Sequence, residues 1–185
     1  MQIRKMVSEV MIYDADDASC STEANNSVPD VGAWTVDIQG VHGVAELTGV
    51  LDQYVGIRQL SFCTHGFPGG VYFRRGCLTA GNLKSVVVPD RLFGPNARLL
   101  FMGCETARGK DGEDFLIAAG KHFFAGKGGI VGGANIYILG LPTGARLPIL
   151  GGSSAGWHRG RLRLYQFDPS GKVTGNQVVK AGLPF

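Results

Sequence analysis

The sequence lacks several features that would assign the protein to a specialised class. No apolar run is long enough to cross a membrane, and the first six residues have no apolar centre of the kind found in a signal peptide. There is no Cys-x-x-Cys spacing, which argues against a zinc ribbon or a thioredoxin-type motif, and no His-x-x-x-His spacing for a helical metal site. We therefore expect a cytoplasmic protein with reduced thiols, no metal, no cofactor and no membrane partner.

Charge and cysteine are also sparse. Lys and Arg total 18 against 15 Asp and Glu, a net charge of +3, and the densest basic stretch is the short segment 159–163. Such a small excess does not favour a nucleic-acid partner. The four cysteines lie far apart and do not form the dense pattern of a secreted disulfide scaffold.

Glycine and apolar residues are abundant instead. Hydrophobic residues make up 44% of the 185 residues, enough for the core of one compact domain. The 29 glycines cluster after hydrophobic runs, where strands would end and where a bare backbone can approach a ligand closely. We predict a single domain over residues 1–185, with a core at about 8–140 and a Gly-rich loop and β-hairpin extension at 141–185.

Hydrophobic patterns along the chain alternate between those of strands and helices. Strands are predicted at 10–13, 34–38, 57–64, 97–102 and 129–132, helices at 44–55 and 111–124, an exposed loop at 18–33, and a C-terminal hairpin at 162–174. The nearly unbroken apolar run at 97–102 is typical of a central parallel strand covered on both faces. The order predicts an α/β fold, a three-layer sandwich around a mostly parallel central sheet.

Two of the predicted strands end in residue pairs that can carry chemistry. One ends at His65-Gly66 and the other at Gly103-Cys104. Parallel α/β sheets bind ligands beyond the carboxyl ends of their strands, so neighbouring strands would bring both side chains to one edge. An imidazole beside a thiol favours the thiolate, the nucleophile of acyl transfer, and the backbone N–H groups of Gly66 and Cys104 could stabilise an oxyanion.

The segments around these strand ends resemble a known family. Three stretches carry the resemblance: LSFCTHG at 60–66, LTAGNL at 78–83 and LLFMGCETARG at 99–109. They are similar to the CHAT domains, in which an apolar strand ends in His-Gly, a Leu-Thr-Ala element follows, and a second apolar strand ends in Ala-Cys-Glu-Thr-Ala. CHAT domains belong to the caspase-like cysteine peptidases of clan CD, with separase, gingipain and the caspases. A related group of bacterial caspase-like domains has Ser-His-Gly followed by Gly-Cys, and this chain looks intermediate between the two groups. The resemblance covers residues 57–135 and is most specific at 104–109.

This resemblance implies a cysteine endopeptidase with a peptide or protein substrate, and it leaves room for an activating partner. By position, His65 matches the general base or acid, Cys104 the nucleophile, and Gly66 an oxyanion contact. Two departures from the family pattern stand out. Gly103 replaces the usual Ala, and the chain after residue 135 does not match the family.

Substrate preference is left open by the sequence. Relatives that cleave after Lys or Arg carry an Asp two residues before the Cys, where this chain has Met102. Glu105, or Asp111 and the acids after it, could supply an acidic pocket, but these carboxylates could equally cap the helix predicted at 111–124. We also place Gly132 and Asn135 among the candidate substrate-binding residues.

Two other readings compete with the peptidase. The segment 152–156, GSSAG, fits the G-x-S-x-G elbow of an α/β serine hydrolase with Ser154 as nucleophile, and 65–70 resembles an esterase oxyanion loop. Too few residues follow Ser154 to supply the helix, Asp and His that such an enzyme needs, and His158 is too near in sequence. The other reading is a caspase-like interaction module whose dyad is idle or opened only by a partner.

Overall fold

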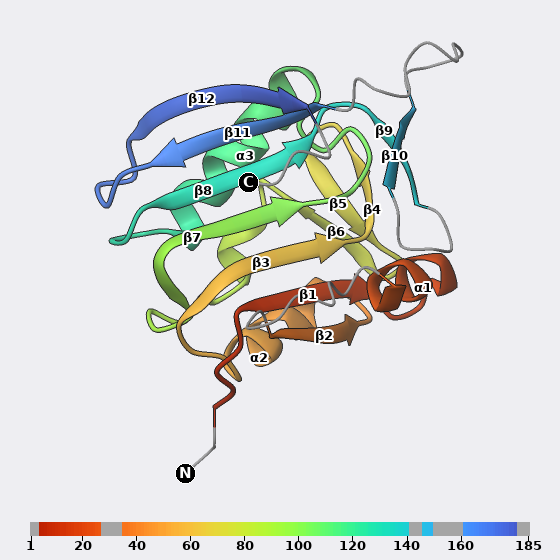
Figure 1. The fold of residues 1–185 in the computed structure, drawn as a ribbon, viewed down its shortest axis with the longest axis horizontal. Helices are drawn as coiled ribbons and strands as arrows, with labels where there is room; N and C mark the ends of the chain where they lie inside the picture. The colour runs from red at the N-terminus through yellow and green to blue at the C-terminus, as the bar shows by residue number, and fades with distance from the viewer. Residues whose placement is uncertain (1–3, 27–34, 141–145, 150–160, 181–185) are drawn as a thin grey trace.

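The computed structural model describes residues 4–26, 35–140, 146–149 and 161–180, and its centre is a seven-stranded sheet (Figure 1). The strands lie in the order β12-β11-β8-β7-β3-β1-β2. Their bounds are β1 Glu9–Asp14, β2 Val36–Val41, β3 Ile57–Cys63, β7 Phe93–Phe101, β8 Gly129–Ala134, β11 Arg161–Phe167 and β12 Val173–Lys180. The five strands from β2 to β8 are parallel; β11 runs antiparallel to β8, and the edge strand β12 runs antiparallel to β11. The predicted α/β fold with a mostly parallel central sheet is confirmed.

Shorter elements surround this sheet. Two smaller sheets contain β4 His65–Phe67, β5 Gly70–Phe73 and β6 Gly76–Thr79, and β9 Tyr137–Gly140 with β10 Arg146–Ile149. The helices are α1 Ala18–Asn26, α2 Leu47–Leu51 and α3 Gly109–Phe123, with 3₁₀ turns η1 Val44–Glu46 and η2 Leu83–Ser85. Among the residues that the structure describes, no helix is both long and apolar enough to cross a membrane.

The main core lies between the central sheet and α3. Alternate residues of a strand face opposite sides, so Leu99 and Phe101 of β7 point to the same face as Phe62 of β3. The Phe62 and Phe101 rings stack with centroids 5.2 Å apart, and Phe101 meets Phe115 of α3 at 4.7 Å. Burial of these aromatic side chains fixes α3 against β7, directly after the loop that carries Cys104.

Helix α1 packs near the opposite face of the sheet. Met11 of β1 and Cys63 of β3 form a small buried cluster with Ala24 of α1. Figure 1 shows α1 beyond the arrowhead of β1, at the edge where the parallel strands end. The helix therefore borders the same edge as the ends of β3 and β7.

Two helical predictions need correction. Residues 18–26 were predicted as part of an exposed loop but form α1, because Cys20 and Ala24, one turn apart, are buried against the sheet. The helix predicted at 44–55 ends at Leu51. Beyond it, Tyr54 is buried, its hydroxyl donates to Asp37 at 2.8 Å, and its backbone forms a bridge with Lys5, so the chain leaves the helical path.

Candidate active site

The ends of β3 and β7 touch at one edge of the central sheet. The two strands are parallel neighbours, with Phe62 opposite Phe101, so both chains leave the sheet side by side. A Cβ atom added to Gly103 would lie 2.8 Å from the backbone nitrogen of Gly66, closer than real Cβ atoms come to such an atom. The two loops thus meet through bare backbone, and the residues next to these glycines, His65 and Cys104, share one edge.

Cys104 begins a loop that is fastened to the residues after β8. The backbone N–H of Glu105 donates to the carbonyl of Ile136 at 2.9 Å. The hydroxyl of Thr106, fully buried, donates to the carbonyl of Gly103 at 3.1 Å. Glu105 has a φ of 54°, the left-handed conformation that closes this tight turn. The loop holds the Cys104 side chain half-buried at the strand end.

His65 is oriented by a carboxylate from a distant part of the chain. Its Nε2 atom lies 3.3 Å from Oδ2 of Asp17, a residue 48 positions earlier. The His65 side chain is 55% exposed and that of Asp17 14%. A carboxylate in this position sets the orientation of an imidazole and stabilises the imidazolium that forms when the ring takes up a proton.

Asp17 is itself held by helix α1, as the residue immediately before the helix. Its Oδ1 accepts hydrogen bonds from the backbone N–H of Ser19 at 2.8 Å and of Cys20 at 3.2 Å, the geometry of a helix N-cap. The Ser19 hydroxyl contributes most to lowering the pKa of Asp17 to about 2, against burial, which acts in the opposite direction. Asp17 is therefore ionised at neutral pH and faces the imidazole of His65.

Sequence reasoning missed Asp17. Asp17 falls between the strand predicted at 10–13 and the loop predicted at 18–33, and it is not among the predicted site residues. The local signal was present, since an Asp directly before a helix is a typical N-cap. The contact with His65 had no such signal, because it depends on where α1 docks against the end of β3.

A second feature that the sequence did not predict adjoins His65. Asp17, Cys20 and His65 each place one potential metal-ligand atom within 4.8 Å of the other two. Burial raises the pKa of Cys20 to about 12. The sequence predicts no metal site, because it has neither a Cys-x-x-Cys nor a His-x-x-x-His spacing. In the structure, the start of α1 brings Asp17 and Cys20 close to His65.

A comparison with protein-family models matches residues 14–122 to a family described as "Domain of unknown function (DUF4347)". This span is more than half of the chain. The chain belongs to the DUF4347 family. Asp17, His65 and Cys104 all lie inside the matched part of the DUF4347 domain. No curated protein and no solved structure shows a significant match.

The acidic residues near Cys104 in this DUF4347 domain differ in their surroundings. The Glu105 side chain is buried and its carboxylate is paired with the guanidinium of Arg108. Asp111 is exposed in the first turn of α3, and its Cβ faces Gly69, in the loop after β4. Of the two predicted pocket acids, Asp111 is thus the one open to solvent.

The remaining predicted substrate residues lie on and after β8. Gly132 pairs with Leu100, four residues before Cys104, and a Cβ added to it would lie 2.5 Å from a Leu164 methyl group. Packing alone thus gives Gly132 a reason to be glycine. Asn135 lies next to Ile136, which bonds the Cys104 loop, and its buried side-chain oxygen has no hydrogen-bond partner among the residues that the structure describes.

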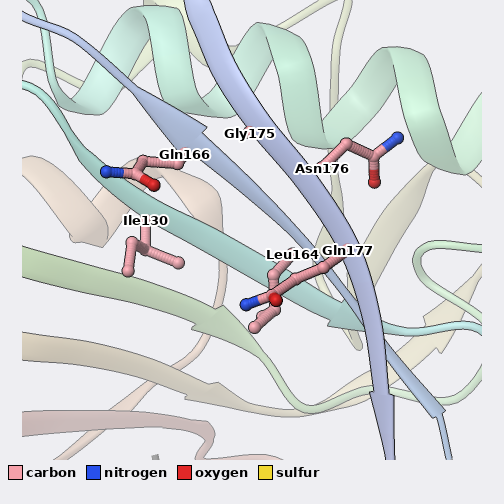
Figure 2. A pocket seen from close by; sticks show the side chains of 6 residues that line it. All are labelled: Ile130, Leu164, Gln166, Gly175, Asn176 and Gln177. Atoms are coloured by element: carbon pink, nitrogen blue, oxygen red, sulfur yellow. The ribbon is translucent and has the colours of Figure 1, made fainter.

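The hollow drawn in Figure 2 lies away from this site. It is about 190 Å³ and is lined by Ile130, Leu164, Gln166, Gly175, Asn176 and Gln177, from β8, β11 and β12 (Figure 2). Ile130 pairs with Arg98, six residues before Cys104. The segment 152–156 with Ser154, and His158, fall outside the described residues.

Proposed function

We propose that this protein is a caspase-like cysteine endopeptidase, in which Cys104 is the nucleophile, His65 the general base and Asp17 the residue that orients the base. The observation that carries the proposal is the contact of the two loops at Gly66 and Gly103, with an ionised carboxylate 3.3 Å from the histidine. A thiol donor, an imidazole and a carboxylate are the parts of a Cys–His–Asp acyl-transfer site.

In the proposed reaction His65 takes the proton of the Cys104 thiol, and the thiolate attacks the carbonyl carbon of the scissile peptide bond. The imidazolium, stabilised by Asp17, then donates its proton to the leaving amine, and a thioester acyl-enzyme remains. A water molecule, deprotonated by the same imidazole, hydrolyses the thioester and releases the carboxylate product and the free thiol.

Negative charge develops on the carbonyl oxygen in both halves of this reaction. The backbone N–H groups of Gly66 and Cys104 are the donors that we assign to it. The Gly66 nitrogen lies directly beside Gly103, the residue before the nucleophile, with no side chain between. Backbone donors fixed in this way are worth about 10²–10³-fold in kcat each.

The proposal is tested with wild type and Cys104→Ala on a peptide library derived from digested proteins, with the new N-termini identified by mass spectrometry. Wild type is expected to produce a defined set of cleavages and Cys104→Ala to lose them, with kcat falling by about 10⁴-fold or more. Cys77→Ala is the matched control, because Cys77 is also half-buried but lies on β6. It is expected to cleave as wild type does.

Identical product profiles for wild type and Cys104→Ala would overturn the proposal and favour the idle interaction module. The serine hydrolase reading has its own readout. A fluorophosphonate probe that modifies Ser154 would support it, whereas a peptide-based electrophile that modifies Cys104 supports the peptidase.

A further inference from the structure

His65 has a second set of neighbours besides the Cys104 loop. Asp17 and Cys20 lie three residues apart at the start of α1, Asp17 directly before the helix and Cys20 in its first turn, and His65 is the first residue of β4. One oxygen, one sulfur and one imidazole nitrogen from these three residues lie within 4.8 Å of one another. Carboxylate, thiol and imidazole are the three ligand types that bind zinc in proteins.

The spacing of the cluster suits a tetrahedral ion. Metal–ligand bonds of about 2.0–2.3 Å at tetrahedral angles separate neighbouring ligand atoms by roughly 3.3–3.8 Å. The distance between Asp17 Oδ2 and His65 Nε2 is already 3.3 Å. The other two ligand–ligand distances are at most 4.8 Å.

The ligand set also selects the metal. A thiolate excludes Mg²⁺ and Ca²⁺, which prefer oxygen ligands, and favours Zn²⁺. Cys20 is 4% exposed and closes the site on the protein side, whereas His65 opens it to solvent. Three protein ligands leave a fourth position, which water fills on the solvent side.

The charges around the cluster are mixed. Asp14 and Glu23 add negative potential at Cys20. The guanidinium of Arg74 lies 3.7 Å from Asp17 Oδ2 and opposes a cation there, but its side chain is 61% exposed and can turn to solvent. A zinc ion would bind the thiolate form of Cys20, so one proton would leave to solvent as the ion binds.

We propose that Asp17, Cys20 and His65 form a zinc site, and that zinc bound there inhibits the protein. A metal ion on the imidazole occupies a nitrogen lone pair and the Asp17 carboxylate together, so His65 loses its orienting partner and can no longer serve as the base for Cys104. The inhibitory half rests on the proposed function. The binding half does not, because it depends only on the three ligands.

Cobalt gives a readout that is independent of activity. Titration of the metal-free protein with Co²⁺ under anaerobic conditions is expected to produce the near-ultraviolet charge-transfer absorption of a cobalt–thiolate bond at one equivalent, and Zn²⁺ is expected to displace it. Cys20→Ser is expected to lose this band, and Asp17→Asn, which keeps the helix cap, is expected to bind Co²⁺ at least about tenfold more weakly.

Two control variants test whether Cys20 is the cysteine that supplies the sulfur ligand. Cys104→Ala and Cys63→Ala are expected to keep the band, although Cys63 lies with its Sγ 3.9 Å from the Cys20 carbonyl. Loss of the band in Cys104→Ala would overturn the proposed site, because the ion would then sit between the nucleophile and His65. Absence of the band in folded wild type, or its persistence in folded Cys20→Ser, would also overturn it.

Inhibition is measured in the same peptide-cleavage assay as the proposed function. Zn²⁺ is expected to abolish cleavage by wild type and a chelator to restore it, and Cys20→Ser is expected to need at least about tenfold more zinc for half-inhibition. Cobalt binding through Cys20 without any peptidase activity would refute the proposed function and leave the metal site standing. If zinc bound at this site and wild type still cleaved peptides at its full rate, the inhibitory role would be refuted and the metal site would stand.

Discussion

Oδ2 of Asp17 lies 3.3 Å from Nε2 of His65, and the same carboxylate caps helix α1 through its other oxygen. One side chain therefore links the docking of an N-terminal helix to the orientation of an imidazole at the end of β3. The contact divides the roles of the two carboxylate oxygens: Oδ1 holds the helix and Oδ2 holds the ring. This division makes the two roles separable by substitution.

Asp17→Asn is expected to lower kcat by about 10²–10⁴-fold with little change in KM, because the amide cannot stabilise the imidazolium of His65. The amide oxygen still accepts the hydrogen bonds that cap α1, so the variant is expected to fold. Steady-state kinetics of peptide cleavage measure the effect. Asp16→Asn is the matched control, since Asp16 pairs with His42 and Arg75 instead. Equal losses in both variants would rule out a specific role for Asp17.

Asp17 is also expected to make stability depend on pH in the acid range. Its pKa is about 2 in the folded protein and 3.8 for an unperturbed Asp, so the ionised form is favoured by folding. The resulting stabilisation is complete above about pH 4 and is lost as pH falls toward about pH 2. Urea unfolding of wild type and Asp17→Asn from pH 6 to pH 2 is expected to show two curves that converge over this window. Curves that stay parallel would show that Asp17 contributes no pH dependence.

The contact of the two loops gives a steric prediction. A Cβ on Gly66 would lie 2.6 Å from the Cys104 carbonyl oxygen, and one on Gly103 would lie 2.8 Å from the Gly66 nitrogen. Gly66→Ala and Gly103→Ala are therefore each expected to lower the free energy of unfolding by about 1–3 kcal/mol and to impair cleavage. Denaturant unfolding and the cleavage assay measure both effects.

Gly49→Ala is the control for this pair. Gly49 lies in α2, and an added Cβ would meet nothing within 4 Å. Alanine is expected to raise the free energy of unfolding there by up to about 1 kcal/mol. If Gly66→Ala and Gly103→Ala behaved like Gly49→Ala, the close approach of the loops would be wrong.

The four thiols are expected to differ in reactivity. Cys104 and Cys77 are half-buried, whereas Cys20 and Cys63 are buried and burial raises the pKa of Cys20 to about 12. Iodoacetamide at mildly acidic pH is expected to modify Cys104 first in the native protein, and Cys20 and Cys63 only after unfolding. Peptide mapping by mass spectrometry shows the order in which the four cysteines are modified. Modification of Cys77 or Cys63 before Cys104 would contradict an activated thiolate.

The central strands of the fold could be predicted because their burial is visible in the sequence. The run that becomes β7 is apolar on both faces, as a strand in a sheet covered on both faces must be, and β3 has the same character toward its end. Those two strands carry His65 and Cys104 at their ends. The prediction that His65 and Cys104 share one edge required these two strands to be neighbours, and β3 and β7 are neighbours in the sheet.

Helix α1 could not be predicted in the same way. Its residues are mostly small and polar, and its buried face consists of little more than Cys20 and Ala24. Such a helix takes its stability from docking and from the Asp17 cap, and neither leaves a hydrophobic period in the sequence. Because α1 carries Asp17 and Cys20, the partners of His65 were missed together with the helix.

The bare contact between Gly66 and Gly103 bears on how this site tolerates mutation. The atoms nearest to a Cβ added on Gly103 belong to the backbone of His65 and Gly66, and those nearest to one on Gly66 are backbone atoms of Gly103 and Cys104 and the Thr106 hydroxyl oxygen. The separation of the two loops is therefore set mainly by the main chain. A saturation screen would thus find two intolerant positions that carry no functional group, each adjacent to one that does. Gly66 and Gly103 would remain intolerant of substitution even in a variant without the Cys104 thiol, because the restriction is imposed by the packing of the two loops and does not depend on catalysis.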